Sequence, residues 1–138
     1  MTCLYKGAEP LEIYPIGVVR GELQGEEKGI VDLNGAKEIS CIDLLPSQRR
    51  FMHRLEDEEF LTIVYYLHKV KSVRSVFNRR FDRKEVGVFA SRTPHRASKI
   101  AIQDVRLLGI RGTTLYVSGL DALDGSPVID IKLKLGNP

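Results

Sequence analysis

The chain has 138 residues, of which 43% are hydrophobic, and this suffices for one domain whose core needs neither a disulfide nor a structural metal. Two cysteines, Cys3 and Cys41, are too few for a disulfide framework or a zinc site, and no segment resembles a membrane span or a signal peptide. The net charge is +3, yet residues 69–99 hold ten Lys or Arg against two acids. We therefore expect a single cytoplasmic domain over residues 1–138 without metal or membrane segment. Nothing in the sequence assigns a role to Cys3.

Apolar and β-branched runs predict that most of the chain forms short strands. Residues 60–70 are dense in β-branched and aromatic side chains, which is typical of a central strand. Residues 128–135 alternate, with Ile131 on one face and Asp130 and Lys132 on the other, where the two charges either pair or face solvent. The predicted strands are residues 14–20, 37–44, 60–70, 87–90, 100–110, 113–119 and 128–135.

One surface helix is predicted between residues 46 and 59. Ser47 is suited to cap its first turn, and Phe51 and Leu55 are an apolar pair one helical turn apart. Residues 71–81 fit both a helical face and a loop, and we interpret them as a mobile basic excursion. Six or seven short strands with one short helix indicate a mainly β, single-domain fold, namely a small closed or nearly closed β-barrel.

Two segments join strand ends to polar loops, where rigid scaffolds usually present functional groups. Residues 87–96 are Gly-Val-Phe-Ala-Ser-Arg-Thr-Pro-His-Arg, and residues 119–132 are Gly-Leu-Asp-Ala-Leu-Asp-Gly-Ser-Pro-Val-Ile-Asp-Ile-Lys. Both resemble motifs of the TsaA-like family, the TrmO-type S-adenosylmethionine-dependent tRNA methyltransferases. Weaker matches at residues 13–20 and 60–69 extend the resemblance over nearly the whole chain.

The resemblance implies a β-barrel, usually a homodimer, that holds S-adenosylmethionine in loops near the subunit interface. The Gly-rich phosphate signature of a Rossmann unit is absent, so cofactor binding would not use that mechanism. A carboxylate suits ribose hydroxyls or the methionine ammonium, and a guanidinium suits a carboxylate or a phosphate. The cofactor-binding residues that the resemblance implies are His68, Lys69, Arg92, Asp121, Ala122, Leu123 and Asp124.

Two alternatives for these residues stay open. The aspartates of the turn at residues 121–124 either contact the cofactor or cap local backbone amides, with Gly125 supplying a positive φ. Arg92 either clamps a ligand or forms a salt bridge with Asp121, Asp124 or Asp130. The sequence assigns no catalytic residue.

Residues 69–99 are a candidate footprint for a polyanion, and the alternative is a solvated loop rich in arginine. The resemblance favours tRNA as the partner. His95 has the chemistry to accept a proton, but we favour phosphate contacts for this residue and its neighbour. The candidate RNA-binding residues are Arg79, Arg80, Arg83, His95 and Arg96.

The primary hypothesis is methyl transfer to N6 of the threonylcarbamoylated adenosine just 3′ of the anticodon of tRNA. The family pattern has Pro-Asn-Pro-Ile-Gly where this chain has Ala-Ser-Lys-Ile-Ala at residues 97–101, and the family's Pro-Arg-Gln segment is missing. These departures predict a weakened activity or a shifted substrate, and a double change of Ala97 and Lys99 to proline should increase turnover. They also favour the alternative of a diverged, non-catalytic barrel that binds S-adenosylmethionine or RNA.

Overall fold

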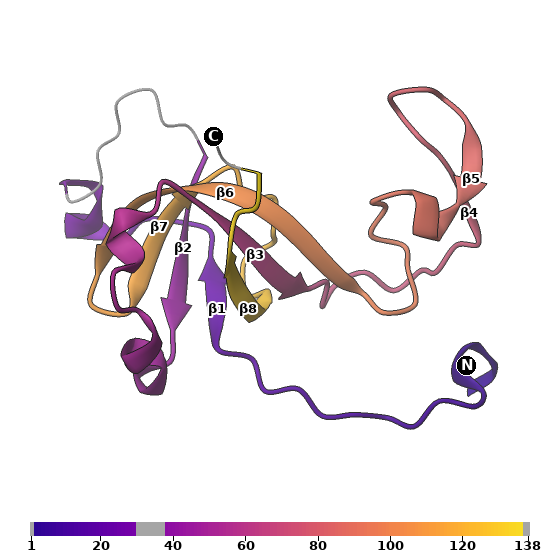
Figure 1. The fold of residues 1–138 in the computed structure, drawn as a ribbon, viewed down its shortest axis with the longest axis horizontal. Coiled ribbons are helices and arrows are strands. Elements are labelled where there is room, and N and C mark those ends of the chain that lie inside the picture. Colours follow the sequence, from indigo (N-terminus) through magenta and orange to yellow (C-terminus); the bar gives the residue numbers. More distant parts are fainter. Residues whose placement is uncertain (1, 30–37, 137–138) are drawn as a thin grey trace.

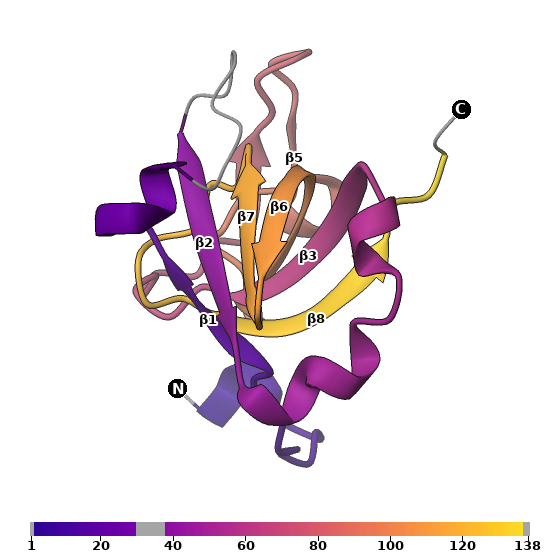
Figure 2. The same cartoon turned by 90° about the vertical axis from the view of Figure 1, so that its left-hand side faces the viewer.

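The computed structural model describes residues 2–29 and 38–136, and its centre is a closed barrel of six strands (Figures 1 and 2). Around the barrel the strands follow the order β1-β2-β7-β6-β3-β8, and each paired neighbour is antiparallel. The strands are β1 (Gly17–Arg20), β2 (Ile39–Leu44), β3 (Phe60–Tyr66), β6 (Ile100–Arg111), β7 (Thr114–Ser118) and β8 (Pro127–Leu133). The predicted mainly β barrel is confirmed.

The core fills the barrel with alternate side chains from its strands. Along β3, Leu61, Ile63 and Tyr65 are buried while the residues between them are partly exposed, as the pleat of a strand with one inward face requires. They pack with buried aliphatic side chains of the other five strands: Val19, Ile42, Leu44, Val105, Leu115, Val117 and Val128. This shared interior fixes the register, and the register fixes where each loop leaves the barrel.

The first strand is shorter than predicted, since β1 begins at Gly17 and residues 6–15 extend away from the barrel (Figure 1). A Cβ on Gly17 would lie 2.6 Å from the Asp43 carbonyl oxygen, so only glycine permits this close approach of β1 to β2. Lys37, at the start of the second predicted strand, lies outside the described residues. No helix within residues 2–29 and 38–136 is long and apolar enough to cross a membrane.

The prediction of one helix between residues 46 and 59 is wrong. This segment forms two short 3-10 helices, η3 (Pro46–Phe51) and η4 (Leu55–Asp57). Between them Arg54 has a φ of 63°, a left-handed conformation that interrupts a right-handed helix. Two further 3-10 helices are η1 (Thr2–Tyr5) and η2 (Gly25–Gly29).

The predicted contacts of that helix are also absent. Leu45, not Ser47, precedes the first helical residue, and no side chain caps the turn. Phe51 is 71% exposed beside the Arg50 guanidinium, whereas Leu55 packs against the barrel core. The two side chains therefore do not form the apolar pair that a continuous α-helix would bring together.

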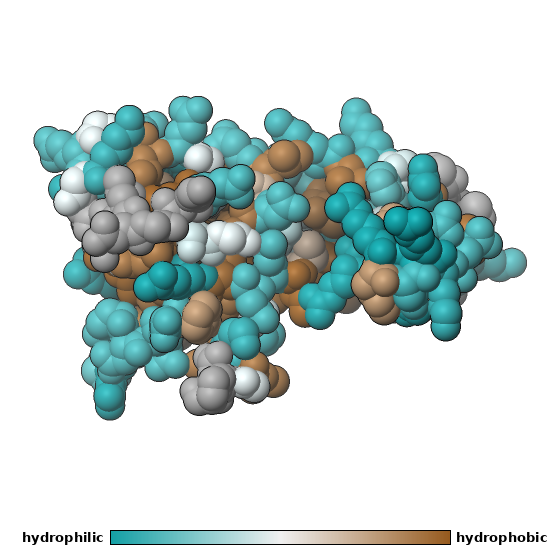
Figure 3. Space-filling model, turned by 90° about the horizontal axis from the view of Figure 1, so that it is seen from above, coloured by the Kyte–Doolittle hydropathy of each residue, from teal (hydrophilic) through white to brown (hydrophobic). Residues whose placement is uncertain are grey.

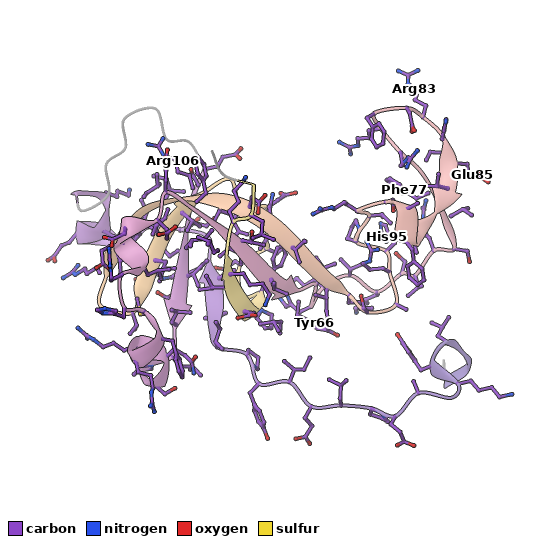
Figure 4. All side chains as sticks on the ribbon, viewed as in Figure 1. Tyr66, Phe77, Arg83, Glu85, His95 and Arg106 are labelled. Atoms are coloured by element: carbon purple, nitrogen blue, oxygen red, sulfur yellow. The ribbon has the colours of Figure 1, made fainter. Side chains whose placement is uncertain are left out.

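Residues 69–99 lie beside one end of the barrel, and we call them the basic lobe (Figures 1 and 4). The lobe contains a two-stranded hairpin of β4 (Val76–Asn78) and β5 (Glu85–Gly87), followed by a 3-10 turn, η5 (Val88–Ala90). The strand predicted at residues 87–90 is therefore wrong beyond its first residue. The excursion was expected to lack regular structure, and its hairpin is a finding of the structure.

Candidate functional site

A cavity of about 810 Å³ lies between one end of the barrel and the basic lobe. Three stretches far apart in the sequence form it: the residues after β3, the loop before β6, and the loop before β8. Pairing of β3 with both β6 and β8 brings these stretches to the same end of the barrel. The lining includes Leu67, His68, Lys69, Arg92, Thr93, Gln103, Asp121, Ala122 and Leu123.

The turn before β8 presents Asp121 to this cavity and turns Asp124 away from it. The Gln103 Oε1 atom accepts a hydrogen bond from the Asp121 amide at 2.7 Å, which fixes the start of the turn. Asp124 Oδ1 instead accepts a bond from the Gly21 amide at 2.9 Å. Gly125 has a φ of 84°, as expected for the residue that closes the turn. Each of the two alternatives for this turn therefore describes one of its aspartates. Asp124 caps a backbone amide, whereas Asp121 lines the cavity together with Ala122 and Leu123.

Two cationic side chains, Lys69 and Arg92, also line the cavity. Within the described residues, Lys69, Arg92 and Asp121 form no ion pair within 4.0 Å, and Asp130 pairs with Lys132 at 2.8 Å. The alternative in which a salt bridge occupies Arg92 is therefore not what the structure contains. Charged groups of both signs are left available to a ligand.

His68 and Tyr65 complete this part of the cavity. The His68 Nδ1 atom lies 3.4 Å from the Ser126 hydroxyl, a contact that ties the end of β3 to the turn before β8. Ser126 is buried and donates to the Leu123 carbonyl at 2.7 Å. Burial, reinforced by the charge of Asp121, raises the pKa of Tyr65 above its ordinary value, so its phenol stays neutral.

His95 and Arg96 hold the loop that carries Arg92. The Arg96 guanidinium donates to the carbonyls of Thr93 at 3.1 Å, Val88 at 3.2 Å and Ser91 at 3.3 Å. The His95 Nδ1 atom lies 2.5 Å from the Ser72 hydroxyl. Both side chains contact other groups of the basic lobe, whereas the sequence favours RNA as their partner.

The three arginines of the hairpin differ in the same way. Arg79 pairs with Asp82 and donates to the Ala90 carbonyl at 3.3 Å. Arg80 and Arg83 are exposed and form no ion pair in the described part of the chain. Arg83 lies at the tip of the lobe (Figure 4).

A second polar cluster lies outside the cavity and joins η2 to the barrel wall. Arg20 donates to Glu27 at 2.6 Å and to Asp43 at 2.8 Å, and the Tyr116 hydroxyl donates to Glu27 at 2.7 Å. Arg20 lowers the pKa of Asp43 and holds the pKa of Glu27 at about 2. Burial raises the pKa of Tyr116 to about 12 and that of the Cys41 thiol to about 11. Because the Cys41 thiol stays protonated, it is a poor nucleophile. The charged groups of the cluster bond to one another, so we assign the cluster a structural role.

The sequence pattern of the tRNA-methyltransferase O N-terminal domain matches residues 23–135, most of the chain. The chain belongs to this family. The resemblance inferred from residues 87–96 and 119–132 is confirmed. In this TrmO N-terminal domain both segments that carry the family resemblance line the cavity.

Relatives of this TrmO N-terminal domain include S-adenosyl-L-methionine-binding proteins and tRNA methyltransferases. A probable S-adenosyl-L-methionine-binding protein of Methanothermobacter thermautotrophicus is 37% identical over 124 residues, which are 88% of each chain. A probable S-adenosyl-L-methionine-binding protein of Archaeoglobus fulgidus is 34% identical over 88% of this chain and 33% of its own length. The mouse tRNA (adenine(37)-N6)-methyltransferase is 35% identical over 56% of this chain and 19% of its own length.

The fold agrees with a solved TrmO structure. The crystal structure of TrmO from Pseudomonas aeruginosa superposes with a TM-score of 0.68 at 27% identity, covering 92% of this chain and 57% of that one. The chain thus spans little more than half the length of that TrmO and one third of the Archaeoglobus protein.

The structure adds site residues that the sequence did not reveal. Gln103 and Asp104 line the cavity from β6, and Thr93 lies buried beside it. Polar residues on an alternating strand are ordinary solvent-facing positions, so no sequence signal marked them. Lys99 has a φ of 55°, which proline cannot adopt, so the gain expected from proline at this position does not follow from the geometry.

Proposed function

We propose that this TrmO N-terminal domain is an S-adenosylmethionine-dependent tRNA methyltransferase, acting on N6 of the threonylcarbamoylated adenosine just 3′ of the anticodon. The observation that carries the proposal is the cavity in which Lys69, Arg92 and Asp121 come together without ion pairs in the described chain. The names of the methyltransferase relatives support the reaction. The names of the S-adenosyl-L-methionine-binding relatives support the cofactor.

The side chains of the cavity fit the chemistry of S-adenosylmethionine. The ligand carries a carboxylate, an ammonium group, a ribose diol and an adenine ring. Arg92 and Lys69 supply cations for the carboxylate, Asp121 supplies an acceptor for the ammonium or the diol, and Leu67 and Leu123 supply apolar surface. A cavity of about 810 Å³ lies within the usual size range of ligand sites.

The cofactor supplies an activated methyl group on a sulfonium, so the chain needs only to bind, orient and exclude water. We assign binding to the two cations and Asp121. His68 keeps the turn before β8 against the end of β3 through Ser126, and it acts as a positioning residue. His95 is not assigned as a base, since its Nδ1 atom already contacts the Ser72 hydroxyl.

The exposed cations of the basic lobe are assigned to the tRNA. Arg80, Arg83 and Lys84 lie on its outer part, and Arg92 lies at the cavity wall. Phosphate contacts by these residues would place an anticodon stem-loop near the methyl donor without selecting its sequence. We also propose a homodimer in the cytoplasm, as the family resemblance implies.

A second candidate function is cofactor binding without methyl transfer. The departures at residues 97–101 favour it, and two relatives of similar length are named only as an S-adenosyl-L-methionine-binding protein or a probable one. In this case the protein would still bind S-adenosylmethionine in the cavity but would not transfer the methyl group to an acceptor.

Calorimetric titration with S-adenosylmethionine, followed by a methyl-transfer assay, tests both candidates. Asp121→Asn should weaken binding by about tenfold or more, because it removes the charge at the cavity. Asp124→Asn is the matched control and should keep the affinity, because its carboxylate faces Gly21. Equal affinities for the two variants would contradict the site.

The transfer assay uses tRNA with and without the threonylcarbamoyl group. Labelled methyl appearing only on the modified tRNA supports the proposed reaction. Saturable cofactor binding with no transfer to either tRNA would select the second candidate. A folded wild type that binds no cofactor would remove both.

A further inference from the structure

We propose that two exposed phenylalanines of the basic lobe, Phe81 and Phe89, stack against unpaired bases of an RNA strand. The inference rests on the proposed tRNA function and assigns base contacts in addition to phosphate contacts. Phe81 is 83% exposed and Phe89 is 91% exposed. Single exposed apolar residues are ordinary on protein surfaces, so the argument depends on how these two are held and what surrounds them.

Phe89 lies on a rigid turn. It is the middle residue of η5, and the preceding Val88 is buried. The Val88 carbonyl accepts hydrogen bonds from the Ser91 hydroxyl at 2.8 Å, the Ser91 amide at 3.1 Å and the Arg96 guanidinium at 3.2 Å. The Val88 amide in turn donates to the Ser75 carbonyl at 3.1 Å. These bonds fix the backbone of the turn from both sides, so little backbone freedom remains to be lost when the exposed ring binds.

Phe81 is linked to the same turn by one arginine. The Arg79 guanidinium lies 4.7 Å from the centre of the Phe81 ring, as in a cation–π contact. The same guanidinium donates to the carbonyl of Ala90, the residue after Phe89. Arg79 is itself held by Asp82. One face of the Phe81 ring therefore lies against a cation. Because Phe81 is 83% exposed, the rest of the ring is available for another contact.

The positive charge of the basic lobe indicates which kind of partner the two rings contact. Exposed Arg80, Arg83 and Lys84 flank Phe81 in the sequence, and exposed Arg92 follows Phe89 by three residues. The whole lobe has ten cations against two acids. Figure 3 shows hydrophilic side chains gathered over the lobe, seen from above. Aromatic rings set among cations suit a single-stranded nucleic acid, because each nucleotide offers a phosphate and a π-face. An apolar protein surface would leave these cations without partners.

Phe51 provides an internal comparison. It is 71% exposed and its ring lies 5.5 Å from the Arg50 guanidinium, so its local geometry resembles that of Phe81. The segment around it, residues 46–59, carries three arginines against four acids. The same aromatic group without excess positive charge has no electrostatic reason to meet RNA.

The test measures binding of two RNA probes by fluorescence anisotropy: an anticodon stem-loop with unpaired loop bases, and a blunt duplex of equal charge. Phe89→Ala and Phe81→Ala should each weaken stem-loop binding by about five- to 150-fold, as loss of one stacked base does. Duplex binding and the salt dependence should not change, because no charge is removed. Phe51→Ala should leave both affinities unchanged.

Conservative variants separate stacking from simple apolar contact. Phe89→Tyr keeps the π-face and should retain stem-loop affinity, whereas Phe89→Leu should lose it. All substitutions are at exposed positions, and circular dichroism with thermal unfolding checks that the fold is intact.

Three outcomes overturn the inference. Stem-loop binding that is unchanged in Phe81→Ala and Phe89→Ala removes it and leaves the proposed function in place. A wild type that binds no stem-loop removes both. A molecular mass of Phe89→Ala below that of the wild type in sedimentation equilibrium would show that the Phe89 ring contacts a second subunit and not RNA.

Discussion

Arg96 offers a direct test of how the cavity wall is built. The basic sequence around it favours contacts with RNA phosphates, whereas its guanidinium donates to three carbonyls of the adjoining loop. Replacement by methionine keeps a long apolar stem and removes all three bonds. We expect the loop that carries Arg92 to open more often, and cofactor affinity to fall with it.

The magnitude follows from the geometry of these bonds. They are 3.1–3.3 Å long and only partly buried, so each contributes about 1 kcal/mol rather than the higher values typical of charged donors. Together they stabilise the loop by about 2–3 kcal/mol. Since about 1.4 kcal/mol is a tenfold change in an equilibrium constant, local opening should become about 30- to 150-fold more frequent.

Amide hydrogen exchange measures this opening residue by residue. The Ser91 amide donates to the Val88 carbonyl, and the Lys99 amide donates to the Arg96 carbonyl, so both should exchange faster in Arg96→Met. Arg80→Met removes the same charge from an exposed position and is the control. The reasoning fails if the exchange rate of Ser91 stays the same while the log–log salt slope of RNA binding falls by roughly 0.7–0.9, the signature of one lost phosphate contact.

Two further predictions concern backbone strain and pH. Lys99→Pro should destabilise the protein by about 3 kcal/mol, because proline cannot adopt a φ of 55° and lacks the amide that bonds to the Arg96 carbonyl. Urea unfolding measures the loss, and Ala97→Pro is the control, since the φ of Ala97 is not positive. Equal unfolding midpoints for the two variants would refute this prediction. The pKa of Glu27 is lowered from 4.5 to about 2, so the stability it contributes is present above about pH 4.5 and is lost as the pH falls towards 2. Acid unfolding of Glu27→Gln should therefore be less steep in this window than that of the wild type, and superimposable curves would count against the role of Arg20.

Hydrophobic patterning was sufficient to predict the barrel and insufficient to predict the segments between its strands. The apolar pattern of residues 100–110 and the alternation of residues 128–135 predicted β6 and β8 to within two residues at each end. In residues 46–59 the apolar spacing favoured an α-helix, but the left-handed φ of Arg54 divides that segment. A non-glycine residue with positive φ leaves no mark in the hydrophobic pattern, because the surrounding contacts impose it.

The site shows the same limit at the level of single side chains. Asp121 and Asp124 are identical in type and three residues apart, yet one lines the cavity and the other accepts the Gly21 amide. The difference arises because β1 continues past the start of β8 and brings Gly21 beside the turn, a contact across 103 positions of sequence. A local motif marks the turn as a candidate site, and only the long-range pairing decides which carboxylate lines the cavity.

Charge counted along a chain therefore overstates the charge that a ligand meets. In the basic lobe, Arg79 and Arg96 donate mainly to groups of the lobe itself, whereas Arg80 and Arg92 have no ion pair in the described chain. The internal arginines fix the hairpin and the loop from which the exposed side chains extend. A lobe with the same net charge but without these internal bonds would have to be ordered when RNA binds, and that entropy would reduce its affinity.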